Sequence, residues 1–91
     1  MIRVLIRPRL IKTAQNLDPE IRKRLEKVMA AIASDFGNSH KHGGIGLRKI
    51  GRRSYEARIG LQWRILFVLE SGALIAHDIL DHDGVLVFVS H

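Results

Sequence analysis

Apolar residues change their spacing abruptly near Leu47, and this change constrains the fold more than any other feature of the chain. Between Ile21 and Phe36 they recur at every third or fourth position, which predicts an amphipathic helix with one buried face. From Leu47 onward apolar and polar residues alternate, and Val, Ile, Tyr and Phe become frequent, which is typical of strands. We therefore expect a largely helical first half that packs against a sheet formed by the second half.

The first half is predicted to begin with a strand and to continue with two helices. Apolar side chains at alternate positions of residues 2–6 favour a strand over the unbroken apolar run of a secretory signal. Pro8 suits the first position of a short helix that reaches Leu17. Asp18 is a good N-cap and Pro19 a good first residue for the second, longer helix. Two residues that can adopt left-handed conformations follow this helix: Gly37 and Asn38.

The second half is predicted to form antiparallel hairpins. Residues 38–46 are rich in glycine and polar side chains, and we expect a loop there within one domain that spans residues 1–91. Strands joined by tight turns, one of them at Ser71 and Gly72, are predicted at residues 55–59, 63–69 and 73–80. A short terminal strand or edge segment is predicted at residues 85–89. The expected fold class is α+β, with an N-terminal strand, a two-helix hairpin and then a three- to four-stranded antiparallel sheet.

Size and composition limit the classes of protein to which the chain can belong. Its 91 residues, 46% hydrophobic and 26% charged, suit one globular domain and exclude a two-domain enzyme. No apolar run approaches the roughly 20 residues of a membrane-spanning helix, and the lack of cysteine excludes disulfides and thiolate chemistry. We therefore expect a soluble protein of the cytoplasm that has no membrane partner.

The chain is strongly basic, since 15 lysines and arginines against 9 acidic residues give a net charge of +6. Such a domain attracts polyanions, nucleic acid first and acidic protein segments second, although surface charge also serves solubility. Six of the basic residues lie between Arg48 and Arg64, where Glu56 is the single acid. This segment is therefore predicted to carry a surface that binds phosphates.

The register of the first hairpin follows from the requirement that both strands place their apolar side chains on one face. Residues of equal parity must then pair, and the tightest such pairing places Arg58 beside Arg64. Like charges at paired positions destabilise a sheet by about 0.2–1 kcal/mol, which favours a phosphate bound between these two arginines. In the alternative, both arginines reach into water or pair with Glu56 and Asp78. The other pairs of this register are Tyr55 with Phe67, Ala57 with Ile65, and Ile59 with Trp63.

Histidines and aspartates near the C-terminus invite a metal site, but their spacing is against it. His77 and Asp78 are adjacent on a strand and point to opposite faces, and the segment from Asp81 to Asp83 lacks the other ligands of a calcium loop. We therefore expect no metal. His82, in the loop after the third strand, is the best proton donor that the sequence offers, with a surface histidine of no function as the alternative. Four further residues are expected to be solvated or to belong to the core: His40 and His42 in the glycine-rich loop, and Tyr55 and Trp63 on the strands.

Four short runs in the second half carry a resemblance to a known family. They are GLRKI at residues 46–50, YEARIG at 55–60, WRILF at 63–67 and LDHDGV at 80–85. These runs resemble the RelE/ParE superfamily of bacterial toxins. The resemblance implies one N-terminal strand, two helices and a curved antiparallel sheet, in agreement with the order inferred from periodicity. It also implies the toxin of a type II toxin–antitoxin pair and, for the RelE-like branch, an endoribonuclease that cleaves mRNA in the ribosomal A site without metal or cofactor.

The resemblance assigns roles to individual residues. Arg64 stands at the catalytic arginine of the family's central strand, Arg58 at a basic position of the preceding strand, and His82 where the family has an arginine or a histidine. A 2′-hydroxyl would attack the adjacent phosphate, the two arginines would stabilise the anionic phosphorane and His82 would protonate the leaving 5′-oxygen. Glu56 could accept a proton, but neighbouring arginines weaken it as a base, so the base stays unassigned. The other cations of the segment are predicted to bind RNA: Arg48, Lys49, Arg52 and Arg53.

The sequence departs from the family where a tyrosine near the C-terminus helps to orient the nucleotide, because Leu86 and Phe88 lack a hydroxyl. Two alternatives to the ribonuclease therefore stay open: a ParE-like inhibitor of DNA gyrase, and a catalytically inactive member that mainly binds an antitoxin. Every toxin alternative implies a cognate antitoxin whose acidic or amphipathic helical segment covers the helices and the basic face. The ribonuclease hypothesis further implies mRNA on the ribosome as a partner.

Overall fold

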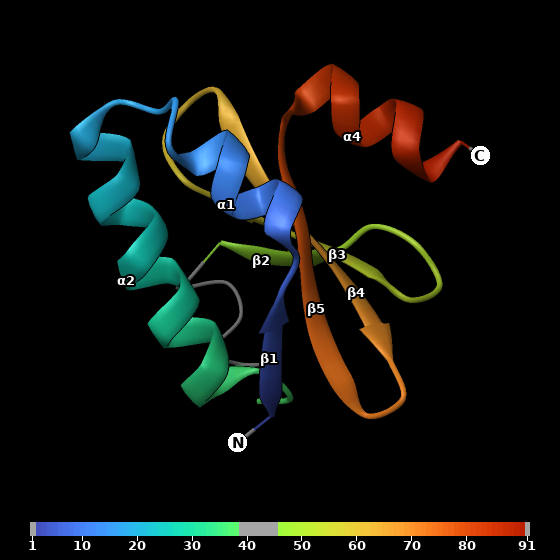
Figure 1. The fold of residues 1–91 in the computed structure, drawn as a ribbon. Helices are drawn as coiled ribbons and strands as arrows, with labels where there is room; N and C mark the ends of the chain where they lie inside the picture. The colour runs from blue at the N-terminus through green and yellow to red at the C-terminus, as the bar shows by residue number, and fades with distance from the viewer. Residues whose placement is uncertain (1, 39–45, 91) are drawn as a thin grey trace.

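The computed structural model describes residues 2–38 and 46–90, and in these ranges it contains five strands and three helices. The loop predicted at residues 38–46 lies almost wholly outside them. No helix in the described ranges is both long and apolar enough to cross a lipid bilayer. Along the chain the elements are β1 (Arg3–Ile6), α1 (Pro8–Ala14), α2 (Pro19–Asp35), β2 (Leu47–Lys49), β3 (Ser54–Arg58), β4 (Trp63–Glu70), β5 (Ala73–Asp81) and α4 (His82–Val89) (Figure 1).

The strands form one mixed sheet in the order β1-β5-β4-β3-β2. The predicted α+β class, with one strand, two helices and then an antiparallel sheet, is confirmed. β1 joins this sheet through parallel pairing with β5, which the sequence did not specify. The fourth antiparallel strand is β2, a segment of three residues that follows the glycine-rich loop.

The register of the β3–β4 hairpin is as predicted. Tyr55 pairs with Phe67, and Arg58 lies directly opposite Arg64. The strands are joined through Gly60, whose φ of +100° is in the left-handed region that side-chain-bearing residues rarely adopt. The predicted turn between β4 and β5 is also confirmed, because Ser71 and Gly72 both have positive φ, as a two-residue hairpin loop requires.

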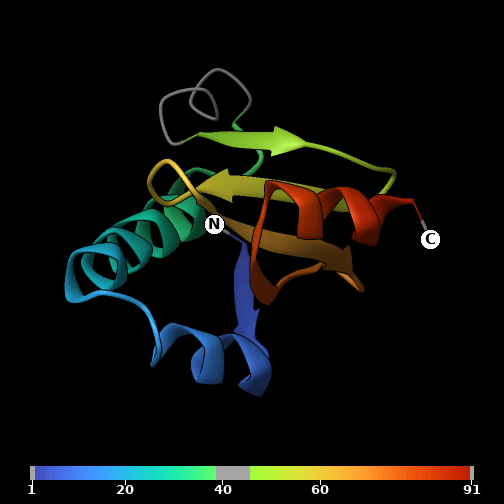
Figure 2. The same cartoon turned by 90° about the horizontal axis from the view of Figure 1, so that it is seen from above.

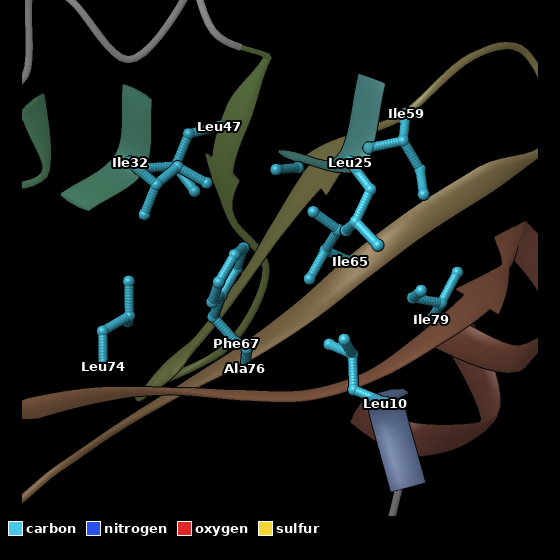
Figure 3. Close-up of a cluster of buried hydrophobic side chains, with 11 residues drawn as sticks. Leu10, Leu25, Ile32, Leu47, Ile59, Ile65, Phe67, Leu74, Ala76 and Ile79 are labelled. Carbon is cyan, nitrogen blue, oxygen red and sulfur yellow. The ribbon is translucent and has the colours of Figure 1, made fainter. Parts of the chain in front are cut away.

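The main core lies between α2 and the sheet (Figure 3). From the predicted stripe of α2, Leu25 and Ile32 are buried, and the other members pack against the core from partly buried positions. Phe67, in the middle of β4, is fully buried. Asp18 and Pro19 occupy the predicted N-cap and first helical positions, although the Asp18 side chain makes no capping hydrogen bond. Of the pair expected to follow α2 in left-handed conformation, only Gly37 has a positive φ.

The segment predicted as a terminal strand at residues 85–89 is a helix, α4, so that prediction was wrong. The Asp81 carboxylate accepts a hydrogen bond of 2.8 Å from the Gly84 backbone N–H and caps the first turn of the helix. This cap and the burial of Val85 outweigh the preference of the valine-rich segment for extended structure. α4 packs against β4 and β5, on the opposite side of the sheet from α2 (Figure 2). His82 therefore begins a helix rather than lying in a loop.

β5 contains a register irregularity and, next to it, a buried aspartate that binds α1. The register between β4 and β5 shifts at Leu66 and Phe67, so His77 is left without a paired residue in β4. The next residue, Asp78, is buried and accepts hydrogen bonds from Arg9 at 3.2 Å and Thr13 at 3.0 Å, both on α1. The suggested alternative of Asp78 as a partner for the hairpin arginines is therefore not realised, because Asp78 anchors α1.

Candidate active site

A hollow of about 440 Å³ opens on the face of the sheet that α2 does not cover. Strand alternation places Glu56 and Arg58 on this face, since Tyr55, before Glu56, and Ala57, between the two, point to the core. The hollow brings together residues from β2, β3, β4 and the first turn of α4. Its lining residues are Gly46, Leu47, Arg48, Glu56, Arg58, Arg64 and His82.

Glu56 is the buried centre of this site, with only 5% of its surface exposed. One carboxylate oxygen, Oε1, accepts a hydrogen bond from Nη2 of Arg48 at 3.2 Å. The other, Oε2, lies 3.0 Å from Nε of Arg64. A buried carboxylate is stable only when it is paired, and here both oxygens have a cationic partner.

Arg64 is the more firmly held of the two partners, because its side chain is 11% exposed whereas that of Arg48 is 70% exposed. Its Nη1 also donates to the carbonyl oxygens of Leu61 at 3.4 Å and Trp63 at 3.2 Å. The guanidinium is therefore fixed between the Glu56 carboxylate and the turn of the β3–β4 hairpin. A cation fixed in this way loses little conformational entropy when it binds an anion.

Arg58 differs from the two arginines that bind Glu56. It is exposed, and no acid in residues 2–38 and 46–90 lies within salt-bridge distance of it. The alternative in which the hairpin arginines pair with Glu56 thus describes Arg64 but not Arg58. Because Arg58 and Arg64 are directly paired, the hollow offers one pre-positioned guanidinium beside one whose charge is not balanced by an acid.

The structure brings His82 to the rim of the same hollow, at the first turn of α4. Its side chain is exposed. The Asp81 cap fixes where the helix begins, and packing of α4 on β4 and β5 fixes where the helix lies. The position of His82 therefore depends on the cap and on the packing of α4.

The far end of α4 rests on His77, whose ring centroid is 5.4 Å from that of Phe88. Burial lowers the pKa of His77 below its ordinary value of 6.5, and the positive charges of Arg9 and Arg7 lower it further, against an opposing effect of Asp78. The neutral imidazole is thus the form that the folded protein favours at this contact.

This shift predicts a loss of stability in mild acid. The unfolded chain binds a proton at His77 near pH 6.5, whereas the folded protein resists it, so the free energy of unfolding falls as the pH drops below that value. Denaturant unfolding at about pH 7.5 and about pH 5.5 should show a larger loss for the wild type than for His77→Gln, which has no imidazole to protonate. Equal losses in the two proteins would contradict this assignment.

The other basic residues predicted to bind RNA lie along the same side of α4. Lys49 lines a second hollow of about 310 Å³, together with Arg48, Glu56, His82 and apolar residues of α4. Arg52 and Arg53 lie before β3 and line a third hollow of about 480 Å³ with Phe88. Arg52 and Arg53 are therefore outside the hollow around Glu56 but lie beside the same helix.

The remaining sequence candidates fall outside this site or outside the described residues. Tyr55 and Trp63 are partly buried against the core, as expected, and the Tyr55 ring packs edge-on against Phe36 at 5.0 Å. His40 and His42 lie outside the described residues. Within residues 2–38 and 46–90 there is no group of three or more side chains arranged to hold a metal ion.

Sequence reasoning missed two contributions to the site. Gly46 and Leu47 line the hollow because β2 pairs with β3, and this pairing also places Arg48 directly opposite Glu56. The apolar wall formed by α4 was missed because its residues had been assigned to a strand. Asp81 is a good N-cap residue with Asp83 in the following turn, and this signal could have identified the helix.

The arrangement can bind a phosphodiester and move protons around it. Guanidinium groups bind phosphate oxygens and stabilise the additional charge of a pentacovalent intermediate. Glu56 is the only acid among the described residues that line the hollow, and it can accept a proton. The imidazole of His82, on the rim, can donate one. These are the groups that cleavage of RNA through its own 2′-hydroxyl requires.

No protein-family model and no curated protein matches the sequence. Solved structures match over nearly the whole chain. One is in the RelB–RelE antitoxin–toxin complex from Methanococcus jannaschii, with 19% identity, a TM-score of 0.69, and coverage of 90% of this chain and 94% of that one. The YoeB–YefM complex from Staphylococcus aureus matches with 16% identity and a TM-score of 0.63, over 90% of this chain and 98% of that one. YafQ from E. coli matches with 9% identity and a TM-score of 0.66, over 93% of this chain and 98% of that one. This chain therefore has the fold of RelE-like toxins, as the sequence resemblance implied.

Proposed function

We propose that this protein is the toxin of a type II toxin–antitoxin pair and acts as a ribosome-dependent endoribonuclease on mRNA. The fold that it shares with RelE, YoeB and YafQ supports the toxin role. One observation carries the proposed activity: Glu56, Arg58, Arg64 and His82 line one hollow, in which the only described acid is held between two arginines. A surface that only binds a protein or DNA needs neither a buried carboxylate nor an exposed imidazole in the hollow that holds the paired arginines.

The proposed reaction uses the substrate's own 2′-hydroxyl. As its oxygen bonds to the adjacent phosphorus, its proton passes to the Glu56 carboxylate. Arg64 and Arg58 stabilise the negative charge that accumulates on the phosphoryl oxygens. The bond from phosphorus to the 5′-oxygen then breaks, and that oxygen takes a proton from protonated His82. The products are an RNA ending in a 2′,3′-cyclic phosphate and one beginning with a 5′-hydroxyl.

The same hollow is also where an antitoxin could block the proposed activity. Two of the structural neighbours are complexes whose names include an antitoxin, RelB or YefM. We propose that a cognate antitoxin presents carboxylates to Arg58 and the other cations and excludes RNA from the hollow. Pull-down with the products of the adjacent reading frames should recover this partner, and an Arg58→Glu variant should bind it more weakly.

Glu56 should oppose RNA binding while supporting cleavage. Its carboxylate occupies hydrogen-bond donors of Arg48 and Arg64 that a phosphate would otherwise use. We therefore expect Glu56→Gln to bind a 2′-O-methyl RNA, which cannot be cleaved, about tenfold more tightly and to lose cleavage of ordinary mRNA. Fluorescence anisotropy measures the first effect and mapping of mRNA breaks the second.

The matched control for this prediction is Glu70→Gln, an exposed position at the end of β4 with the same change of charge. If both variants bind the 2′-O-methyl RNA equally tightly, the effect belongs to net charge rather than to Glu56. If Glu56→Gln still cleaves at the wild-type rate, Glu56 is not the proton acceptor.

The proposed function is tested by inducing the protein in cells and mapping the 5′ ends of their mRNAs. New ends at defined positions within codons, together with arrested growth, are expected. Arrest without new RNA ends, accompanied by inhibition of DNA supercoiling in vitro, would support the gyrase alternative. Normal growth and intact mRNA would favour an inactive member of the fold that mainly binds an antitoxin.

A further inference from the structure

Three neighbouring hollows lie side by side along α4, and each shares lining residues with the next. The hollow around Glu56 shares Arg48, Glu56 and His82 with the second. The second shares Val89, in the last turn of α4, with the third. A continuous surface therefore extends from the proposed cleavage site along the whole length of α4.

The third hollow has the chemistry of a nucleotide site. Arg52 and Arg53 are exposed, and neither has an acid within salt-bridge distance in the described parts of the chain. The opposite wall is formed by Phe88 and Val89. Guanidinium groups bind the phosphates of a single strand, while an aromatic ring and an aliphatic neighbour give an unpaired base a surface on which to pack.

We propose that this third hollow, formed by Arg52, Arg53 and Phe88, is a second subsite for the RNA strand whose phosphodiester is cleaved beside Glu56. This inference rests on the proposed function and extends it, because it makes the substrate several nucleotides long and gives the strand a path along α4. Arg52 and Arg53 bind phosphates, and Phe88 supports a base. The subsite raises affinity and takes no part in the chemical step.

The composition of the surface favours RNA over an acidic protein segment. Cations occur along one side of the path, at Arg48, Lys49, Arg52 and Arg53, whereas apolar residues of α4 form the other side. A single-stranded nucleic acid has phosphates along one edge and bases along the other, so both sides of the path find a partner. The Phe88 ring is also held in place by its contact with His77, which prepares it to support a base.

Binding of short and long 2′-O-methyl oligonucleotides tests the subsite. With probes of about three and about eight nucleotides, the wild type should bind the longer one more tightly, because only that probe can reach both subsites. The Arg52→Ala/Arg53→Ala variant should lose this advantage, with a salt dependence reduced by about 1.4 in log–log slope, or about 0.7 for each lost phosphate contact. Its affinity for the short probe should be unchanged.

Phe88 is tested with a pair of substitutions. Phe88→Leu keeps an apolar side chain but removes the ring, so we expect about tenfold weaker binding of the long probe. Phe88→Tyr keeps the ring and should bind like the wild type. Thermal unfolding of each variant establishes that α4 is still packed.

The control for the arginines is Arg22→Ala/Lys23→Ala, which removes two exposed charges from α2. If this variant weakens binding of the long probe as much as Arg52→Ala/Arg53→Ala does, the loss of affinity reflects net charge in general and the proposed subsite is wrong. If an octaglutamate peptide binds more tightly than the long probe and depends on the same two arginines, the hollow belongs to a protein partner instead. If the wild type cleaves mRNA but none of these variants changes binding of the long probe, the subsite alone is overturned. If the wild type does not cleave mRNA but Arg52→Ala/Arg53→Ala and Phe88→Leu weaken binding of the long probe, only the proposed function is overturned.

Discussion

Replacing Arg64 with alanine should reduce mRNA cleavage by about a thousandfold, the upper end of the loss seen when one pre-positioned donor to a transition-state anion is removed. Arg64 is fixed on one side by Glu56 and on the other by the carbonyls of Leu61 and Trp63. Its loss removes a positioned cation and also leaves Oε2 of the buried Glu56 without a partner. The measurement is the rate at which mRNA fragments appear in a translation extract.

Two further variants separate the role of the Arg64 guanidinium from the loss of a positive charge. Arg64→Lys keeps the charge but cannot reproduce the planar geometry of the guanidinium, so its activity should lie between those of Arg64→Ala and the wild type. Arg22→Ala makes the same change of charge on the exposed face of α2 and should leave cleavage unchanged. A folded Arg64→Ala protein that cleaves within threefold of the wild-type rate would remove Arg64 from the mechanism.

Replacing His82 with alanine should also reduce cleavage by about a thousandfold, within the range ascribed to general acids. Its side chain is exposed, so the substitution should change the free energy of unfolding little. The specific test is an mRNA in which the leaving 5′-oxygen at one cleavage position is replaced by sulfur. A thiolate departs without protonation, so His82→Ala should cleave this substrate at nearly the wild-type rate.

Asp83→Asn is the matched control for His82, because Asp83 is exposed in the same turn of α4 and does not line the hollow around Glu56. It should cleave both substrates normally. If the sulfur substrate is cleaved as slowly by His82→Ala as the ordinary one, His82 does not protonate the leaving group.

The parts of the fold that could be predicted are those in which a single pattern admits one solution. Alternation along β3 and β4 excluded a shift by one residue, which would turn every apolar side chain to the other face, and the tightest pairing of equal parity then placed Arg58 opposite Arg64, as observed. The buried face of α2 was also predictable, because its apolar residues recur at every third or fourth position and therefore share one side of a helix. The parallel pairing of β1 with β5 was not specified, since an apolar strand can occupy either edge of a sheet.

The helix α4 shows where local preference misleads. Val85, Val87 and Val89 alternate with other residues and favour a strand by propensity. The structure instead has a capped helix, because the Asp81 carboxylate satisfies the Gly84 N–H and burial of Val85 stabilises the helix against the sheet. Tertiary packing decides between two patterns that a short apolar segment supports almost equally.

The candidate site was predictable only in part for a related reason. Sequence alternation placed Glu56, Arg58 and Arg64 on one face, but the choice of Arg64 rather than Arg58 as the partner of Glu56 depends on side-chain directions. Arg48 enters the site only because β2 pairs with β3. The third hollow, with Arg52, Arg53 and Phe88, could not be foreseen while residues 85–89 were assigned to a strand.

The most direct test of the central claim is primer extension on a reporter mRNA incubated with the purified protein, with and without translating ribosomes. We expect breaks at defined codon positions only when ribosomes translate the message, and the upstream fragments should end in 2′,3′-cyclic phosphates. The Arg64→Ala and His82→Ala variants should leave the mRNA intact. An mRNA that stays intact and is translated normally in the presence of the folded wild-type protein would contradict the account.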